Sequence, residues 1–167
     1  GVGRQGQAVS EEWQVVVVAR SPMDANIFTR GGVNVFPIYV YNSSNVNNSE
    51  SNNAIENISI DFRSWLDGKY GHHFEPEEVV GYVYAILHSL IYRERYTDFL
   101  SDDFPRIPFT EQASDFEALS ALGWELMQAH LLREVPAQGL GSYQGRGNNE
   151  VVKPRHAEAE EALYINE

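Results

Sequence analysis

The sequence predicts a mixed α+β fold, a single domain with a central long helix, a second capped helix and short strands, and three observations predict it. The segment 13–19 contains the run Val15 to Val18, and four consecutive β-branched residues are typical of a strand covered on both faces. The segment 76–91 carries apolar residues at helical spacing behind an N-terminal proline. The sequence Ser114-Asp115-Phe116-Glu117 has the pattern of a capping box and predicts a helix that extends to about residue 132.

The other elements follow from residues that break or end regular structure. The segment 33–41 predicts a second strand that is bulged or at an edge, because Pro37 cannot donate to a β-ladder. Residues 42–53, with six Asn and four Ser, predict an exposed loop. A helix over 61–70 would end at Gly71. The helix that begins at Pro76 is expected to continue or restart as far as residue 100, 104–108 should be extended, and short strands are expected at 151–152 and 163–165.

Composition limits the possible function classes. The chain has 167 residues, 43% of them hydrophobic, so it can form a core, and no apolar run approaches the ~20 residues of a membrane helix. It has no cysteine, which excludes disulfides, thiolate metal sites and cysteine catalysis. The net charge of −12 disfavours nucleic acid on average, so a nucleic-acid role requires a local patch. The opening Gly-Val-Gly-Arg-Gln, without an initiator Met or signal peptide, predicts a piece of a longer polypeptide.

One segment provides such a patch. Residues 136–157 contain three cations and one carboxylate, a net charge of +2, and are also rich in glycine and amides. Gln144, Arg146, Asn148 and Asn149 have the chemistry for base edges, because Arg can bind guanine and Gln or Asn can bind adenine, whereas Lys153, Arg155 and His156 would position the strand on phosphates. The candidate DNA-binding residues are Gln144, Arg146, Asn148, Asn149, Lys153, Arg155 and His156. A plain surface loop is the alternative interpretation of this segment.

Most enzyme signatures are missing from the sequence. It contains no Walker A motif, no Gly-x-Ser-x-Gly elbow and no His-Glu-x-x-His motif. Asp67-Gly68-Lys69 matches half of a metal-dependent nuclease site, and its partner would be Asp24 or Asp61. His88 and His130 lie beside apolar residues on expected helices and are interpreted as structural.

Several aromatic and arginine residues are interpreted structurally. Five aromatic residues lie on or beside apolar helices and are expected in the core: Tyr82, Tyr84, Tyr92, Tyr96 and Phe104. Arg106 stands between two prolines and is expected to be buried, paired with Asp102 or Asp103. Arg93 and Arg95 adjoin acidic residues, which favours a solvated, salt-bridged face.

Three longer segments carry a specific resemblance. They are Phe36-Pro37-Ile38-Tyr39-Val40-Tyr41, then 81–89 (GYVYAILHS) with 92–96 (YRERY), and then 103–108 (DFPRIP) followed by 122–126 (LGWEL) and 130–132 (HLL). In this order they resemble the C-terminal specificity domain of type ISP restriction–modification enzymes and of related N6-adenine DNA methyltransferases. Arg4-Gln5 and Tyr164-Ile165-Asn166 also match family positions. The likeness covers most of the chain.

The resemblance also shows departures. The family usually has a proline after the His-Ser of the long helix, where this chain has Leu90, so a continuous helix is expected here. The Asn-rich loop resembles an insertion. The family continues beyond the Tyr-Ile-Asn segment, so the resemblance implies that this recognition domain is incomplete.

The resemblance implies a function and a domain organisation. Residues 1–41 would be strands and a linker from a preceding methyltransferase region, 42–60 a loop, and 61–167 an incomplete target-recognition domain. The region would choose a double-stranded DNA sequence without catalysis or a cofactor of its own. The parent would be a bacterial, cytoplasmic enzyme that uses S-adenosylmethionine, with ATP and magnesium as further candidate cofactors and no membrane as a partner. A scaffold that docks other domains of the same polypeptide, and a nuclease at Asp67 and Lys69, are the alternatives.

Overall fold

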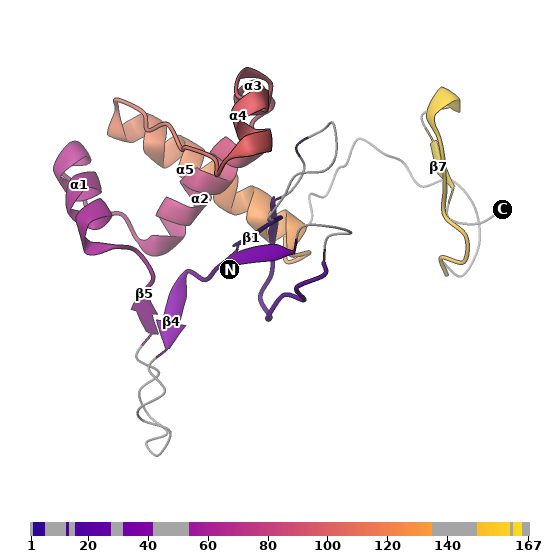
Figure 1. Ribbon diagram of the computed structural model, residues 1–167, viewed down its shortest axis with the longest axis horizontal. Coiled ribbons are helices and arrows are strands. Elements are labelled where there is room, and N and C mark those ends of the chain that lie inside the picture. Colours follow the sequence, from indigo (N-terminus) through magenta and orange to yellow (C-terminus); the bar gives the residue numbers. More distant parts are fainter. Residues whose placement is uncertain are drawn as a thin grey trace, which may run out of the picture. The chain divides into compact units, whose positions relative to one another are not determined.

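The computed structural model describes residues 2–5, 13, 16–27, 32–41, 54–134, 150–160 and 162–164. They form a mixed α+β structure, as the sequence predicts (Figure 1). The chain divides into two compact units, Gly1–Val135 and Pro136–Glu167, which are described separately. This division does not test the boundaries at residues 42 and 61, which stay a prediction. No described helix is long and apolar enough to cross a bilayer.

The first unit contains a small antiparallel sheet of three strands, with the order β2-β1-β3. The strands are β1 (Val2–Gln5), β2 (Val16–Val18) and β3 (Val33–Phe36). Val2 lies opposite Val18 on one side and opposite Phe36 on the other. The β-branched run therefore forms the predicted strand, although only three of its residues belong to β2 in the described part of the chain.

The predicted strand over 33–41 is two strands, because Pro37 interrupts it. After β3, the chain enters β4 (Tyr39–Tyr41), which pairs with β5 (Ala54–Glu56) in a separate hairpin. Beyond the predicted loop, residues 54–56 form β5 and a helix begins at Ile60. The stretch 42–53 lies outside the described residues.

Helix α1 (Ile60–Tyr70) has the boundaries that its sequence predicts. The side chain of Ser59 accepts a hydrogen bond from the backbone N–H of Phe62 at the N-terminus. Gly71 ends the helix in the left-handed conformation, with φ 63°, a conformation that glycine adopts without steric cost. The sequence therefore determines both ends of α1.

The long helix does not continue through Leu90, so the expected continuous helix is wrong, and the alternative expectation, a restart toward residue 100, is confirmed. Helix α2 (Pro76–His88) ends at Ser89, whose backbone is extended, with ψ 123°. The Ser89 side chain then accepts a hydrogen bond from the backbone N–H of Tyr92 and caps α3 (Leu90–Arg95). The capping serine therefore breaks the helix even though the next residue is not proline.

Helix α4 (Thr97–Asp102) follows, and an extended segment leads to α5 (Ala113–His130), in agreement with the expected extension over 104–108. The N-cap of α5 is Gln112, so Ser114 lies inside the first turn and the predicted capping box is wrong. A reciprocal bond of this kind occurs at α2 instead, where Glu78 accepts from the backbone N–H of Glu75.

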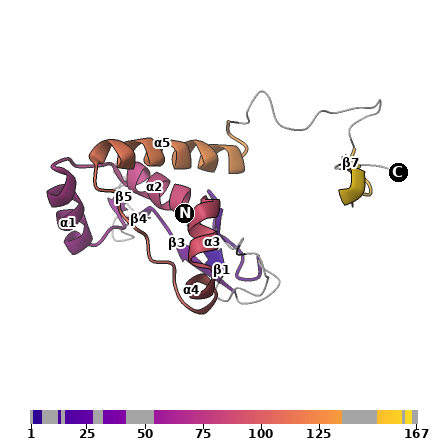
Figure 2. The same ribbon diagram turned by 90° about the horizontal axis from the view of Figure 1, so that it is seen from above.

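Helices α2 and α5 cross closely and form the centre of the first unit, as Figures 1 and 2 show. Glycines face each other at the crossing, since a Cβ built on Gly123 would lie 1.9 Å from the carbonyl oxygen of Gly81. The Ser120 hydroxyl donates a hydrogen bond of 2.6 Å to the carbonyl oxygen of Glu78 across the crossing. Two glycines therefore allow the backbones to approach to a distance that any larger side chain would prevent.

Two apolar clusters pack on either side of α2. One joins the three-stranded sheet to the four helices α2, α3, α4 and α5. It consists of Trp13, Val16, Tyr84, Leu87, Tyr92, Leu100 and Met127. The other joins α1, α2 and α5 and consists of Leu66, Phe74, Val79, Tyr82 and Phe116. Tyr82 and Phe116 stack with ring centroids 4.4 Å apart. Both clusters depend on α2, which confirms it as the central helix.

The second unit contains a two-stranded antiparallel ribbon in its described part. Strand β6 (Arg155–Ala157) pairs with β7 (Ala162–Tyr164), and a short 3₁₀ turn, η2 (Glu158–Glu160), joins them. The strand predicted at 151–152 is wrong, because those residues precede β6 without belonging to it. The other predicted strand, over 163–165, overlaps β7.

Candidate nucleic-acid interface

The β6–β7 ribbon carries two of the predicted DNA-binding residues on opposite faces. Arg155 lies directly opposite Tyr164, and His156 lies opposite Leu163. Because side chains alternate along a strand, Arg155 and Tyr164 share one face and His156 lies on the other. All four residues are exposed. Both faces of the ribbon are therefore accessible within the second unit.

Arg155 has a defined arrangement with two neighbours. Its guanidinium carbon lies 4.5 Å from the ring centroid of Tyr164, which is a cation–π contact. The Tyr164 hydroxyl donates a hydrogen bond to the carboxylate of Glu160 on η2. This bond and the charge of Glu160 raise the pKa of Tyr164, with Arg155 acting in the opposite direction. The three side chains form a connected polar group on one face of the ribbon.

The other predicted site residues are only partly described. Lys153 is exposed in the turn before β6. Gln144, Arg146, Asn148 and Asn149 lie outside the described residues, so the prediction that all seven act together stays a prediction. Tyr164 matches a family position, but the sequence did not predict the interactions of Tyr164 with Arg155 and Glu160, because the contact with Arg155 depends on the hairpin register.

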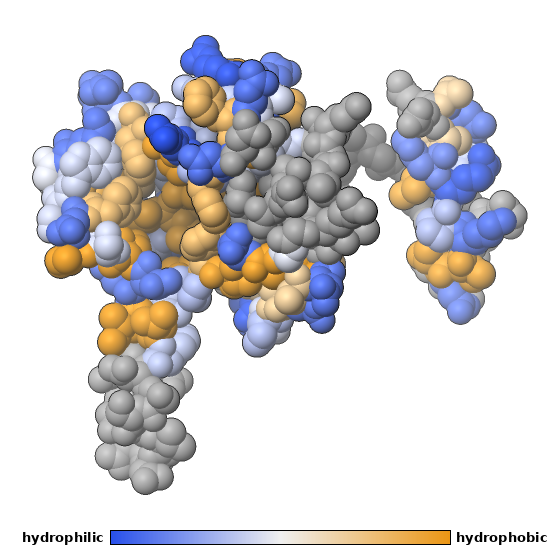
Figure 3. Space-filling model, in the orientation of Figure 1, coloured by the Kyte–Doolittle hydropathy of each residue, from blue (hydrophilic) through white to orange (hydrophobic). Residues whose placement is uncertain are grey.

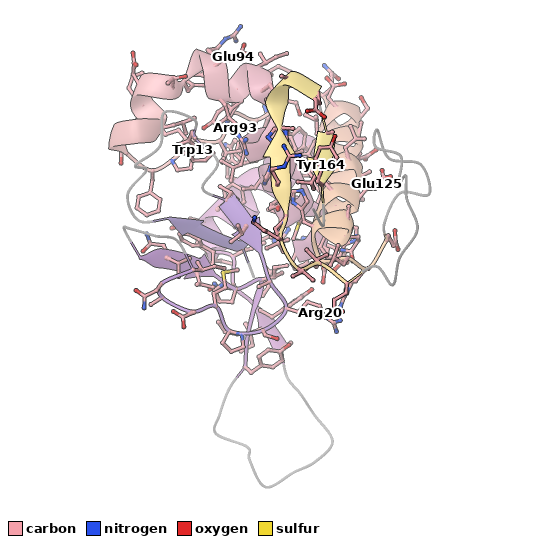
Figure 4. The ribbon with its side chains drawn as sticks, turned by 90° about the vertical axis from the view of Figure 1, so that its right-hand side faces the viewer. Trp13, Arg20, Arg93, Glu94, Glu125 and Tyr164 are labelled. Carbon is pink, nitrogen blue, oxygen red and sulfur yellow. The ribbon has the colours of Figure 1, made fainter. Side chains whose placement is uncertain are left out.

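Arg93 in the first unit differs from its sequence interpretation. It was expected on a solvated, salt-bridged face, but it is half-buried and its guanidinium carbon lies 5.6 Å from the ring centroid of Trp13 (Figure 4). Its Nε donates to the carbonyl oxygen of Leu87 at 2.7 Å. Another of its nitrogens donates to Nδ1 of His88 at 3.1 Å. Arg93 therefore joins the end of α2 to α3 instead of facing a partner.

The two histidines predicted as structural lie together at this end of α2. Burial, the charge of Arg93 and the neighbouring His130 lower the pKa of His88 to about 4. The hydroxyl of Tyr84 lies 2.7 Å from Nδ1 of His130, and burial raises the pKa of Tyr84 to about 12. Because Nδ1 of His88 accepts a hydrogen bond from Arg93, the proton of the neutral His88 ring lies on Nε2. This Nε2 is buried and has no hydrogen-bond partner among the described residues. His88 is thus a neutral residue of the core.

Sequence reasoning missed a buried arginine, Arg63 on α1. It is 5% exposed and forms an ion pair with Glu56 on β5. It also donates to the carbonyl oxygen of Phe74 at 2.6 Å. No periodic signal identifies such a residue, because its partner lies on a hairpin that the sequence did not predict. Arg63 therefore connects β5 to α1, and the carboxylate of Glu56 compensates the buried charge of the arginine.

Arg106 is the reverse case, because it was expected to be buried. Its side chain is 90% exposed, and its guanidinium lies 4.0 Å from a carboxylate oxygen of Asp103. Tyr96 and Phe104 are also exposed, whereas Tyr82, Tyr84 and Tyr92 are buried as predicted. The exposed rings line a cavity of about 350 Å³ between α3–α4 and the extended segment 103–108.

The proposed nuclease pair is engaged in other interactions. One carboxylate oxygen of Asp67 lies 2.7 Å from Nδ1 of His73, and the other lies 4.0 Å from Arg63. Lys69 lies 3.7 Å from Glu111. In the part of the chain that the structure describes, no three acidic or histidine side chains are placed to hold a metal ion.

Comparison with known protein families identifies the chain. The model of the type ISP C-terminal specificity domain matches residues 1–167, the whole sequence. The chain belongs to this family. Neither the curated proteins nor the solved structures give a match. Membership supports a role in sequence recognition, and a specificity domain is noncatalytic, in agreement with the prediction from the sequence.

Proposed function

We propose that this specificity domain is the DNA sequence-recognition region of a restriction–modification enzyme or adenine-N6 DNA methyltransferase. The observation that carries the proposal is the match of the whole chain to the type ISP C-terminal specificity domain. The region selects a site on double-stranded DNA, and other domains of the same polypeptide perform the chemistry. In this proposal those domains use S-adenosylmethionine in the bacterial cytoplasm, with ATP and magnesium as further candidate cofactors.

The second unit supplies a suitable shape and suitable chemistry. A two-stranded antiparallel ribbon fits the major groove of B-DNA, which is about 12 Å wide. The ribbon exposes Arg155 and His156, and Lys153 is exposed just before it. In this proposal Gln144, Arg146, Asn148 and Asn149 provide further contacts from the segment that precedes the ribbon.

The acidity of the chain is compatible with this arrangement if few phosphates are bound. The net charge of −12 repels DNA at long range, so non-specific affinity is low. Each phosphate contact contributes about 0.9 to the slope of log affinity against log salt. Three such contacts, which the sequence interpretation assigns to Lys153, Arg155 and His156, would give a slope of only about −2 to −3.

The test is binding of the chain to a pool of duplexes with a randomised centre, followed by sequencing of the bound fraction. We expect a preferred sequence and a shallow salt slope. The double variant R146Q/K153Q should weaken binding, while the matched variant Arg20→Gln removes an exposed charge from the first unit and should not. Binding without any sequence preference, or equal effects of these variants, would contradict the proposal.

A docking role is the second candidate, and exposed apolar residues on α3 and α4 favour it. Leu90 and Ile91 are each 71% exposed and Phe99 is 68% exposed. Apolar surface is also exposed on the β4–β5 hairpin, where Val40 lies opposite Ile55 (Figure 3). Contiguous apolar surface of this kind marks protein interfaces. In the polypeptide that carries this domain, I91K/F99K would then impair domain association without altering the preferred DNA sequence.

A further inference from the structure

We propose that Arg155 reads a guanine in the major groove, and that Tyr164, held by Glu160, is the residue that positions it. This inference rests on the proposed DNA-recognition function and assigns the base-reading role within it. Chemistry alone suits Arg155 to a phosphate as well as to a base. Three features of the β6–β7 ribbon favour a base.

The first feature is the ordered guanidinium. Arg155 and Tyr164 form a directly opposed cross-strand pair, and the ring lies 4.5 Å below the guanidinium carbon. Stacking on a ring restrains the plane of the guanidinium while leaving its N–H edges available. A guanine presents O6 and N7 as two adjacent acceptors, which require a planar donor pair in a fixed orientation. A phosphate can also accept a bidentate pair, but its several oxygens accept from more than one direction, so it does not require one fixed orientation of the guanidinium.

The second feature is the carboxylate of Glu160. It accepts the hydrogen bond from the Tyr164 hydroxyl, so it lies at the same ring that carries Arg155. A carboxylate beside the cation opposes the approach of an anionic phosphate. The acceptors of a guanine are uncharged, so this penalty is smaller for a base edge. The local charge therefore favours a neutral acceptor.

The third feature is the size of the neighbouring side chains. Ala157 lies opposite Ala162, two residues along each strand and therefore on the same face as Arg155. Two methyl groups beside the arginine leave room for base edges to approach the ribbon. The opposite face carries Leu163 beside His156 and has no arginine. The face of the ribbon that carries Arg155 therefore leaves room for a base edge to come close to the arginine.

The test compares variants of the full chain in the randomised-duplex selection. The unmodified chain should require a guanine at one position or more. Arg155→Lys keeps the charge but loses the planar donor pair, so preference for guanine at one position should fall roughly tenfold or more. Tyr164→Leu should weaken preference at the same position with an unchanged salt slope, and Tyr164→Phe, which retains the ring, should keep most of it. Leu163→Thr, on the other face, is the matched control and should leave the preference intact.

A chemical substitution in the DNA gives a second measurement. Replacing the selected guanine by 7-deazaguanine removes the N7 acceptor and should weaken binding of the unmodified chain but not of Arg155→Ala, which has no donor at this position. If Arg155→Ala instead weakens all sequences equally and reduces the salt slope by about 1, Arg155 is a phosphate contact and the assignment is overturned. If the unmodified chain binds no duplex, the proposed function fails and this assignment fails with it.

Discussion

Replacing Gly123 by alanine should strongly destabilise the first unit, because the two central helices cross at this glycine. The added Cβ would lie 1.9 Å from the carbonyl oxygen of Gly81 and 2.8 Å from the backbone nitrogen of Ala85. A Cβ atom essentially never lies closer than 3.0 Å to such an atom, so the helices would have to separate by about 1 Å. Both contacts are with backbone atoms, and therefore no change of rotamer relieves them.

The expected free-energy change follows from three contributions. Overpacking of a core costs about 3 kcal/mol at the upper end of its usual range. Separation of the helices also breaks the hydrogen bond between Ser120 and the Glu78 carbonyl, which adds about 1 kcal/mol. The better helix propensity of alanine offsets about 1 kcal/mol. The net loss in the free energy of unfolding is therefore about 3 kcal/mol.

Urea unfolding followed by far-ultraviolet circular dichroism measures this loss. With a denaturant slope of about 2 kcal/mol per M, the midpoint should fall by about 1.5 M. Gly68→Ala is the matched control, since Gly68 lies within α1 and a Cβ there would meet nothing within 4 Å. The control should raise stability by up to about 1 kcal/mol. If both variants raise the midpoint, the close crossing of α2 and α5 is refuted.

Three further perturbations test other parts of the first unit. Arg63→Leu should lower the free energy of unfolding by about 2 kcal/mol, because Glu56 loses its ion-pair partner; an unchanged urea midpoint would contradict this. Stability should fall as the pH falls from 6.5 to about 4, by at most about 1.4 kcal/mol per pH unit, because the unfolded chain protonates His88 before the folded chain does. His88→Gln should flatten that part of the pH profile, and an identical profile would refute the attribution of this pH dependence to His88. Leu90→Pro should change stability by no more than about 0.5 kcal/mol, since Ser89 is already extended and proline suits the first position of a helix; a loss above about 2 kcal/mol would indicate a continuous helix.

The sequence predicted correctly those ends of helices and strands that single residues in the same segment determine. Gly71 ends α1 where expected because a left-handed C-terminal residue is a property of the backbone itself. Pro37 interrupts the second strand for a similar reason. The capping prediction at Ser114 was wrong, since several residues in that stretch can begin a helix and the packing of Phe116 decides the position. Local chemistry therefore identified elements more reliably than it located their ends.

Contacts between distant segments were not predictable in the same way. Arg63 is buried because Glu56 reaches it from a hairpin, and Arg106 is exposed although it stands between two prolines. Charged side chains follow no hydrophobic periodicity, so burial of an arginine depends on a partner that only the tertiary structure provides. The contact between Tyr164 and Arg155 was not predicted for a similar reason, because it depends on how β6 pairs with β7.

The segments that carry the family resemblance determine how the helices pack more than they determine which residues are proposed to contact DNA. The stretches 81–89 and 122–126 contain Gly81 and Gly123, which set the distance between α2 and α5. Residues at such a crossing have few alternatives, since any larger side chain separates the helices. A residue that reads DNA is exposed, and packing does not restrict its identity. Arg155 lies outside those stretches, so the target sequence must be determined from the chemistry of the ribbon and from binding measurements.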